Sequence, residues 1–251
     1  MPNWTWASAC CRGASHVKLG TRRQDALRCL ATDPQTLIAV VSDGAGSAGH
    51  GGEGASVAVR TIVSSAQKHM RSSSDHPDDE CLMSWTDDIR DRLERFSKLR
   101  SVERKSFAAT LVGVISIGTQ SVIFHIGDGA AVGRNSVTGV WETLSWPEHG
   151  EYASTTFFLT DDPSVRIRIA RPAQALDALA IFSDGIERLA LSFANNVPHA
   201  PFFNGIIKPV EQSSITGRDH SLSIKLANYL NSAEVNERTD DDKSLIIAAF
   251  K

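Results

Sequence analysis

The chain has 251 residues, and 41% of them are apolar, which is enough for a substantial core in one large domain or two small ones. A net charge of −3 gives no electrostatic basis for binding nucleic acid or an anionic membrane. Because no apolar run approaches the roughly 18 residues of a membrane span, we expect neither a membrane nor a nucleic acid as a partner.

The first eleven residues lack the basic region and apolar stretch that mark a secretory signal. None of the cysteines shows Cys-x-x-Cys spacing, and the adjacent pair has poor geometry for sharing one metal; they are Cys10, Cys11, Cys29 and Cys81. Reduced thiols in a cytoplasmic protein are therefore expected.

Strand patterns are the clearest local signals along the chain. Alternation over residues 4–8 predicts an edge strand. Two hairpins are predicted, and the second continues as a meander; in chain order the strands are residues 26–31, 37–41, 108–117, 121–126, 130–134 and 140–144. Three further strands are predicted over residues 165–170, 178–182 and 245–250.

Helical patterns are fewer, and the polar segments between them read as loops. Apolar residues at helical spacing predict helices over residues 54–70, 85–99, 185–191 and 221–230. Residues 71–80 are predicted to be a loop between two helices. Residues 146–163 and the proline-containing segment 195–217 are predicted to be irregular.

This order of elements predicts the fold class. Because most connections are hairpins, the sheets should be mainly antiparallel. The strands are nearly continuous apolar runs, which indicates burial on both faces. We therefore predict an α/β (α+β) layered sandwich, with two sheets packed together and flanked by helices, in a single domain over residues 1–251.

Acidic residues next to glycines lie at the edges of several predicted strands: Asp25, Asp43, Asp184 and the run Asp240–Asp242. Any one of them alone is explained as a turn or cap residue. Their spread from one end of the chain to the other predicts that several strands deliver carboxylates to one point. Hard oxygen ligands favour Mg²⁺ or Mn²⁺, so the pattern indicates a metal-dependent hydrolase.

Six motifs in order resemble a known family. The series Gly20-x-x-x-Gln24-Asp25-Ala26, Val41-Ser42-Asp43-Gly44-Ala45-Gly46-Ser47, Phe107-Ala-Ala-Thr110-Leu111, Gly127-Asp128-Gly129, Phe182-Ser183-Asp184-Gly185 and Asp241-Asp242-Lys243-Ser244 is similar to the metal-dependent serine/threonine protein phosphatases of the 2C (PPM) type. The second motif resembles the compact bacterial, PphC-like branch. Each motif alone is weak, whereas six in order over nearly the whole chain are specific.

The resemblance implies a dimetal site. Two divalent cations, Mn²⁺ or Mg²⁺, would be held by Asp25, Asp43, the carbonyl of Gly44, Asp184 and Asp241, with Asp43 bridging the pair. A bridging water would become hydroxide near neutral pH and attack phosphorus in line, without a phosphorylated enzyme. The implied activity is hydrolysis of phosphoserine and phosphothreonine in a protein substrate, in a pathway that contains a cognate serine/threonine kinase.

Asp128 matches the family position that is associated with a third, weaker metal. An Asp-Gly hairpin turn explains the same residues equally well. Both interpretations stand at this point.

The sequence departs from the family at the position of its general acid. Many relatives carry a His two residues after the second-motif Asp to protonate the leaving alcohol, and this chain has Ala45 there. Loss of a general acid costs roughly 10²–10⁴-fold in rate. His16 and His50 are candidates for the role by sequence proximity alone.

The sequence also differs from the family at two positions that concern phosphate binding and metal binding. Relatives often carry a phosphate-binding Arg where this chain has Gly20, and either Arg22 or Arg23 is predicted to replace it. Gln24 replaces a frequent Glu, which removes one negative charge beside the metal ligands.

Two alternative functions therefore remain. The missing His is compatible with a pseudo-phosphatase or regulatory module that binds a phosphoprotein or kinase without turnover, although the intact acidic set argues against it. A hydrolase of small phosphoesters is the other alternative.

Overall fold

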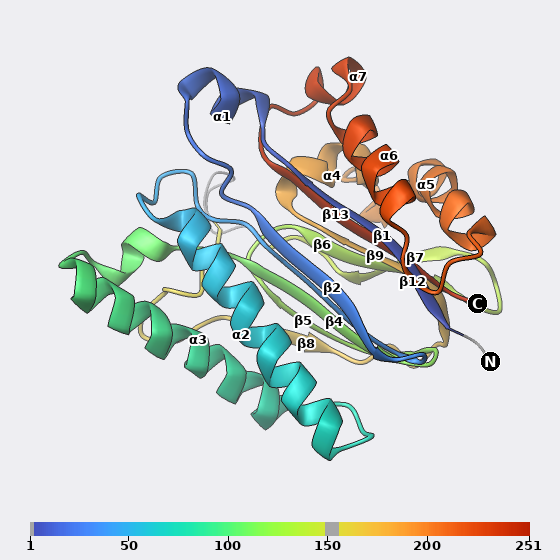
Figure 1. The fold of residues 1–251 in the computed structure, drawn as a ribbon, viewed down its shortest axis with the longest axis horizontal. Helices are drawn as coiled ribbons and strands as arrows, with labels where there is room; N and C mark the ends of the chain where they lie inside the picture. The colour runs from blue at the N-terminus through green and yellow to red at the C-terminus, as the bar shows by residue number, and fades with distance from the viewer. Residues whose placement is uncertain (1–2, 149–155) are drawn as a thin grey trace.

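The computed structural model describes residues 3–148 and 156–251, and it arranges them in four layers: helices, sheet, sheet, helices (Figure 1). The six-stranded sheet has the order β12 (Gly217–Arg218), β1 (Trp4–Cys11), β13 (Lys243–Phe250), β9 (Leu176–Phe182), β6 (Ala130–Asn135) and β7 (Trp141–Ser145). The five-stranded sheet has the order β2 (Ala26–Asp33), β3 (Thr36–Ser42), β4 (Leu111–Ile117), β5 (Gln120–Ile126) and β8 (Arg168–Ala170). Apart from the β1–β12 pair, neighbouring strands are antiparallel.

Helices cover the outer faces of both sheets. The five-stranded sheet is covered by α2 (Gly51–Ser72) and α3 (Asp79–Arg100), and the short helix η1 (Arg104–Phe107) follows them. The six-stranded sheet is covered by α4 (Asp184–Ala190), α5 (Ala200–Gln212) and α6 (His220–Leu230). The remaining short elements are α1 (Ala14–Leu19), α7 (Ala233–Asn236), β10 (Leu191–Ser192) and β11 (Val197–Pro198).

Three apolar clusters hold the layers together. One lies between the six-stranded sheet and its helices and includes Phe182 and Phe203. A second lies between the five-stranded sheet and α2 and α3, with Trp85 and Leu93 from α3. The third, which includes Trp4, fills the space between the two sheets. Burial on both faces explains why the strands read as continuous apolar runs, and the predicted sandwich is confirmed.

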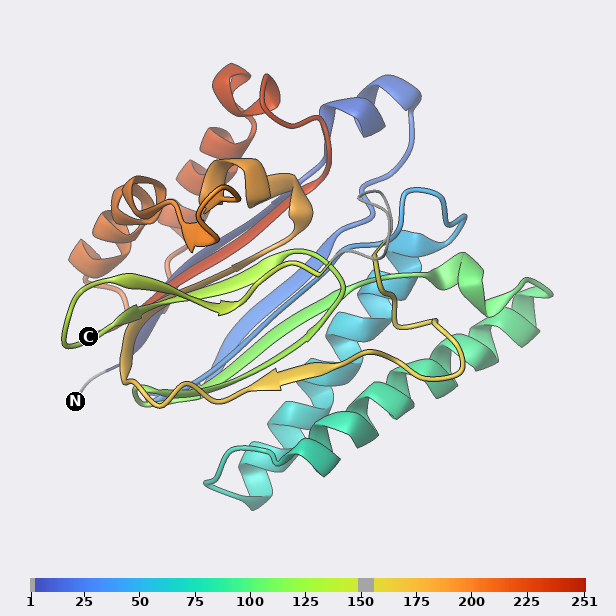
Figure 2. The ribbon, with the colours of Figure 1, turned by 180° about the vertical axis from the view of Figure 1, so that it is seen from behind.

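The first hairpin, the loop between α2 and α3, and the final strand agree with the prediction. The predicted meander is wrong, because β5 and β6 belong to different sheets and β6 pairs with β7 and β9 (Figure 2). The chain crosses between the sheets at residues 127–129, where two glycines have positive φ angles. The predicted edge strand β1 lies inside its sheet, between β13 and the two-residue β12.

Several boundaries and three helices also differ from the prediction. The segment 195–217 contains α5, because Pro201 lies in the first turn, where a helix needs no N–H donor, and the apolar residues 203, 207 and 210 face the sheet. Helices α1 and α7 were not predicted at all. Helix α3 begins at Asp79 rather than residue 85, since Asp78 caps it through the amide of Cys81. Strand β4 begins at residue 111 and β8 at residue 168. The predicted irregular segment 146–163 lies partly outside the described residues.

Within residues 3–148 and 156–251, no helix is long and apolar enough to cross a membrane.

Candidate active site

The predicted acidic residues lie at one end of the sandwich, opposite the chain termini (Figure 1). Asp25 immediately precedes β2, and Asp43 immediately follows β3. Because β2 and β3 pair antiparallel, with Ala26 opposite Ser42, these two positions are neighbours. Asp184 follows β9 and Asp241 precedes β13, and these strands are likewise antiparallel partners. The two sheets thus bring one pair of acids each to the same end.

Asp25 and Asp43 are held from several sides. Their carboxyl groups approach within hydrogen-bonding distance of each other. Ser183 Oγ donates to Asp25 Oδ2 over 2.7 Å, and the amide of Ser244 donates to Ser183 Oγ over 3.0 Å. The amide of Thr110 donates to the Asp43 carbonyl over 2.8 Å, and the Asp43 amide donates to Thr110 Oγ1 over 3.2 Å. Thr110, Ser183 and Ser244 therefore position the first two acids.

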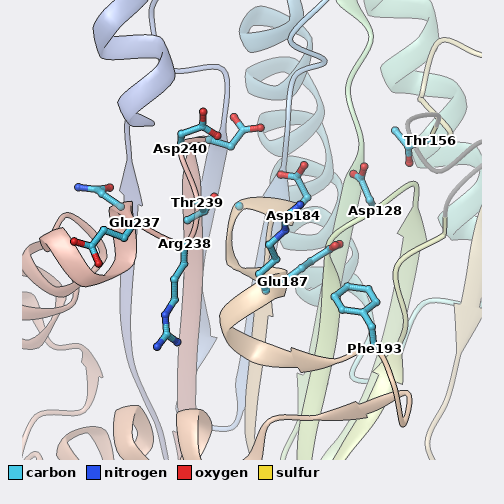
Figure 3. Close-up of a pocket in the computed structure, with 13 residues that line it drawn as sticks. Asp128, Thr156, Asp184, Glu187, Phe193, Glu237, Arg238, Thr239 and Asp240 are labelled. Atoms are coloured by element: carbon cyan, nitrogen blue, oxygen red, sulfur yellow. The ribbon is translucent and has the colours of Figure 1, made fainter.

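The other acids line an open cleft of about 820 Å³. Asp128 and Asp184 point into it side by side, and Arg238 turns away from them (Figure 3). Asp128 lies on the crossover between the sheets, so the hairpin-turn interpretation of this residue is wrong. Glu187, on α4, was not predicted: it lines the same cleft, and its Oε1 accepts from the amide of Gly129 over 2.8 Å.

The adjacent residues Asp241 and Asp242 have different surroundings. The Asp241 side chain is 48% exposed and lines the cleft. The Asp242 side chain is 1% exposed, and its carboxylate accepts from the amides of Gly13 and Gln24. Asp242 therefore ties the segment before Asp25 to the start of β13, a role that the sequence analysis did not assign.

Gly44 lies against the first turn of α2. A Cβ atom at this position would collide with the backbone of Gly51, so only glycine fits. The glycine thus lets the chain that follows Asp43 pass close to the helix.

Burial and mutual repulsion raise the pKa values of these acids. Burial, more than any other factor, raises the pKa of Asp25 to about 6. The pKa of Asp43 is raised well above its usual range by burial and then by the charges of Asp25 and Asp184. Burial followed by the charges of Asp128 and Asp241 does the same for Asp184. The carboxylates are therefore close enough to disfavour one another's ionisation.

The donor set fits hard divalent cations. The Oδ1 atoms of Asp25 and Asp184 are buried and accept no hydrogen bond from the described part of the chain, although a buried carboxylate oxygen needs a partner. A cation satisfies such oxygens and offsets the repulsion. In the described residues, no three His, Cys, Asp or Glu side chains form a closed ligand set.

The structure distinguishes the two candidate arginines. Arg23 donates to the carbonyls of Asp25 and Cys10, over 3.1 and 2.9 Å, so its guanidinium is already engaged. Arg22 is exposed, lines a second hollow of about 620 Å³, and makes no hydrogen bond or ion pair with a described residue. Gln24 donates to the carbonyl of Ala48 over 3.3 Å, which fastens the glycine-rich loop.

The two candidate histidines also differ. His50 stacks on Phe107, with ring centroids 5.1 Å apart, and lies 3.2 Å from Glu53 and 3.1 Å from Arg100. His16 lies 2.9 Å from Asp242 instead. Both line the second hollow.

Comparison with known proteins supports the same assignment. A family model described as protein phosphatase 2C matches residues 12–231. The chain belongs to the protein phosphatase 2C family. The chain is 34% identical to serine/threonine-protein phosphatase 3 of Escherichia coli (strain K12), over 99% of each protein. The family and this relative indicate a phosphoprotein phosphatase, a hydrolase.

Two solved structures show the same fold at low identity. Phosphatase Stp1 from Staphylococcus aureus superposes with a TM-score of 0.66 at 17% identity, covering 100% of this chain and 96% of that one. The catalytic domain of phosphatase PstP, solved in complex with two manganese ions, gives a TM-score of 0.63 at 12% identity, covering 100% and 99%. A serine/threonine phosphatase with this fold is therefore known from Staphylococcus aureus.

Proposed function

We propose that this protein phosphatase 2C chain hydrolyses phosphoserine and phosphothreonine in proteins, with two divalent cations, Mn²⁺ or Mg²⁺, at the carboxylates. Asp25, Asp43, Asp184 and Asp241 would hold the pair together with the Gly44 carbonyl, and Asp128 would hold a third, weaker ion. When bound, the two cations would supply activation of a water molecule as the nucleophile and would offset charge on the phosphoryl oxygens, while the acidic residues would hold the ions in place.

One observation carries this proposal: two antiparallel strand pairs, one from each sheet, bring acids that repel one another to one place. A fold does not keep several mutually repelling carboxylates together for its own stability. Such an arrangement is typical of a functional site. The manganese-bound relative supports the choice of metal class.

Arg22 is the proposed phosphate-binding residue. Its guanidinium makes no hydrogen bond or ion pair with any residue that the structure describes, and it can form two parallel N–H···O bonds with phosphoryl oxygens. The engaged guanidinium of Arg23 would instead hold the chain around Asp25 in place.

The proposal extends to the setting of the enzyme. The substrate would be a phosphorylated protein whose kinase is a cognate serine/threonine kinase. The cysteines of the described residues are all free thiols, which supports a cytoplasmic location. Residues 1–251 would act as a single catalytic domain.

The proposal is tested by turnover of a phosphoseryl peptide and of p-nitrophenyl phosphate with and without Mn²⁺. We expect Mn²⁺-dependent release of phosphate from both, and loss of at least 10³-fold in Asp43→Asn. Asp87→Asn is the matched control, because Asp87 is an exposed acid on α3. Peptide binding without any turnover would favour the pseudo-phosphatase alternative, and faster turnover of small metabolite phosphates would favour the small-phosphoester hydrolase.

A further inference from the structure

The acidic cleft has two basic residues in its walls that the proposed function does not use. Arg188 on α4 and Arg238 after α7 both line the cleft of about 820 Å³. Both side chains are exposed, and neither guanidinium makes a hydrogen bond or ion pair with a residue that the structure describes. Each is therefore available to a ligand, and a planar guanidinium is suited to a carboxylate or a phosphate.

Arg238 lies away from the proposed metal ligands. Its side chain points away from Asp128 and Asp184, and it points in the direction opposite to that of Asp240 (Figure 3). The phosphoryl group would be held at the acids, so it is not the group that Arg238 reaches. A ligand of Arg238 has to be a second anionic group of the same substrate.

The wall that carries Arg238 is held from behind by a buried lysine. The Lys243 side chain is fully buried, and its Nζ donates to Asn236 Oδ1 over 2.8 Å and to the Asp241 carbonyl over 3.4 Å. The amide of Arg238 donates to the Val235 carbonyl over 3.0 Å. The backbone at Arg238 is thus fixed while its side chain stays exposed, and a fixed backbone lowers the entropy cost of binding a ligand.

The remaining acids of the cleft do not neutralise this arginine. Glu237 and Asp240 line the cleft but are not among the proposed metal ligands. The Glu237 side chain points away from Asp184, and in the described part of the chain neither Glu237 nor Asp240 forms an ion pair with Arg238 (Figure 3). The charge of Arg238 is therefore left for a substrate to complement.

The cleft is larger than a phosphorylated side chain requires. Its volume of about 820 Å³ lies within the range of about 300–1,000 Å³ that is typical of pockets for whole small-molecule ligands. An extended peptide advances by about 3.3–3.6 Å per residue. Residues on either side of a phosphoserine can therefore pass along the walls that α4 and the segment after α7 provide.

We propose that Arg188 and Arg238 bind acidic side chains that flank the phosphorylated residue, so that the substrate is an acidic segment of a phosphoprotein. The inference rests on the proposed function and deepens it, because it names the substrate class. An Asp or Glu side chain accepts two parallel N–H···O bonds from a guanidinium, whereas a side-chain amide offers only one oxygen. The two arginines act on substrate binding and take no part in the bond to phosphorus.

Phosphoseryl peptides that differ at one flanking position at a time test the inference. In the wild-type enzyme with Mn²⁺, we expect Asp to give a kcat/KM about fivefold higher than Asn at one or more of the five positions on either side, which corresponds to about 1 kcal/mol for a partly exposed ion pair. The difference should lie in KM rather than kcat, and it should shrink at high ionic strength because salt screens exposed charges. Equal kcat/KM values for the Asp and Asn peptides at every position would overturn the inference.

Charge reversal identifies the arginines in a way that misfolding cannot imitate. Arg238→Glu should lose the preference for Asp and favour Lys at the same position, and the reversal should be larger when Arg188→Glu is combined with it. Arg95→Glu is the matched control, since Arg95 is an exposed arginine on α3 and does not line the cleft. A double variant that keeps the preference for Asp, or a control that loses it, would overturn the inference.

Failure of this inference is distinguishable from failure of the proposed function. Turnover of phosphoseryl peptides without a preference for acidic neighbours overturns the role of the two arginines alone. If the wild-type enzyme shows no Mn²⁺-dependent turnover of any phosphoseryl peptide, the proposed function itself fails, and the inference fails with it.

Discussion

At the residue scale, identical side chains in this protein phosphatase 2C have roles that their neighbours decide. Asp241 and Asp242 are adjacent, but one faces the cleft and the other satisfies backbone amides inside the protein. The sequence predicted that one of three consecutive acids is a ligand. It did not indicate that the next one holds the segment before Asp25, since that contact joins residues far apart in the chain.

Measurements of stability and of activity distinguish the role of Asp241 from that of Asp242. We expect Asp241→Ala to lower kcat by at least 10³-fold and to change the melting temperature little. Asp242→Ala should lower the melting temperature, because buried amides that lose their acceptor cost about 1–3 kcal/mol. Thermal denaturation and phosphatase assays measure both quantities. A stable Asp242→Ala together with an unstable Asp241→Ala would contradict the assignment.

The roles of Arg22 and Arg23 can be distinguished by the same two kinds of measurement. Arg22→Ala should lower kcat/KM for a phosphoseryl peptide by about 10-fold, because a charge-assisted hydrogen bond contributes about 1.5–3 kcal/mol. Arg23→Ala should instead reduce stability, since its bonds go to backbone carbonyls of the protein. Steady-state kinetics on both variants decides between them. If Arg23→Ala shows the kinetic defect with unchanged stability, the roles are reversed.

At the element scale, close backbone contacts set the strand ends on which the acids lie. Gly185 is the second residue of α4, directly after Asp184, and a Cβ atom there would collide with the carbonyl oxygen of Asp242. Helix α4 and the start of β13 therefore approach each other through a glycine. Any side chain at this position has to move Asp184 away from the chain that carries Asp241.

A substitution at Gly185 tests this contact. Gly185→Ala should lower the melting temperature and weaken Mn²⁺ binding, measured by calorimetric titration. Gly205→Ala is the matched control: Gly205 lies in α5, and a Cβ atom there meets no atom within 4 Å. Since alanine is preferred over glycine inside a helix, the control should be stabilised by about 0.5–1 kcal/mol. Unchanged Mn²⁺ binding in Gly185→Ala would contradict this account.

The elements also show what a sequence can and cannot predict. Hairpins such as β2–β3 were predictable, because both strands and their turn are local. The transfer of the chain from β5 to β6 was not, because a short turn suits a hairpin and a crossover equally well, and only pairing with the distant β9 decides it. Helix α5 was missed because its prolines suggested irregular structure, although Pro201 occupies a permitted position.

For the site, the acids could be predicted from the motifs, whereas the residues that hold the acids in position could not. Asp25, Asp43 and Asp184 each lie next to a strand end that the sequence marks clearly. Ser183 lies in one of the motifs, but its contact with Asp25 was not predictable, and Glu187 gave no signal at all, since the partners Asp25 and Gly129 are distant in sequence. The choice between Arg22 and Arg23 likewise needed the contacts of the folded chain.

At the scale of the whole molecule, stability and metal binding are coupled through the same carboxylates. Burial raises the pKa of Asp25 to about 6 and that of Glu187 to about 7 in the metal-free protein. Both values are above those of the unfolded chain, so the folded state binds more protons near neutral pH. By linkage, the stability that these groups contribute is present at low pH and is lost as the pH rises through 6 and 7.

The metal-free enzyme should therefore become less stable between pH 5.5 and pH 8. We expect its melting temperature in EDTA to fall over this range, with each kcal/mol corresponding to about 2–4 °C for a chain of this size. Mn²⁺ should remove most of the fall, because it binds the ionised carboxylates and displaces their protons. The stabilisation by a fixed Mn²⁺ concentration should accordingly be larger at pH 8 than at pH 6. Differential scanning calorimetry with EDTA or Mn²⁺ at each pH measures both effects.

Asp43→Asn removes one of the repelling charges, so the melting temperature of its metal-free form should fall less with rising pH and should respond little to Mn²⁺. A metal-free melting temperature that rises over this range in the wild-type enzyme would contradict the coupling, since it would mean that the buried acids are stabilised as anions without a cation.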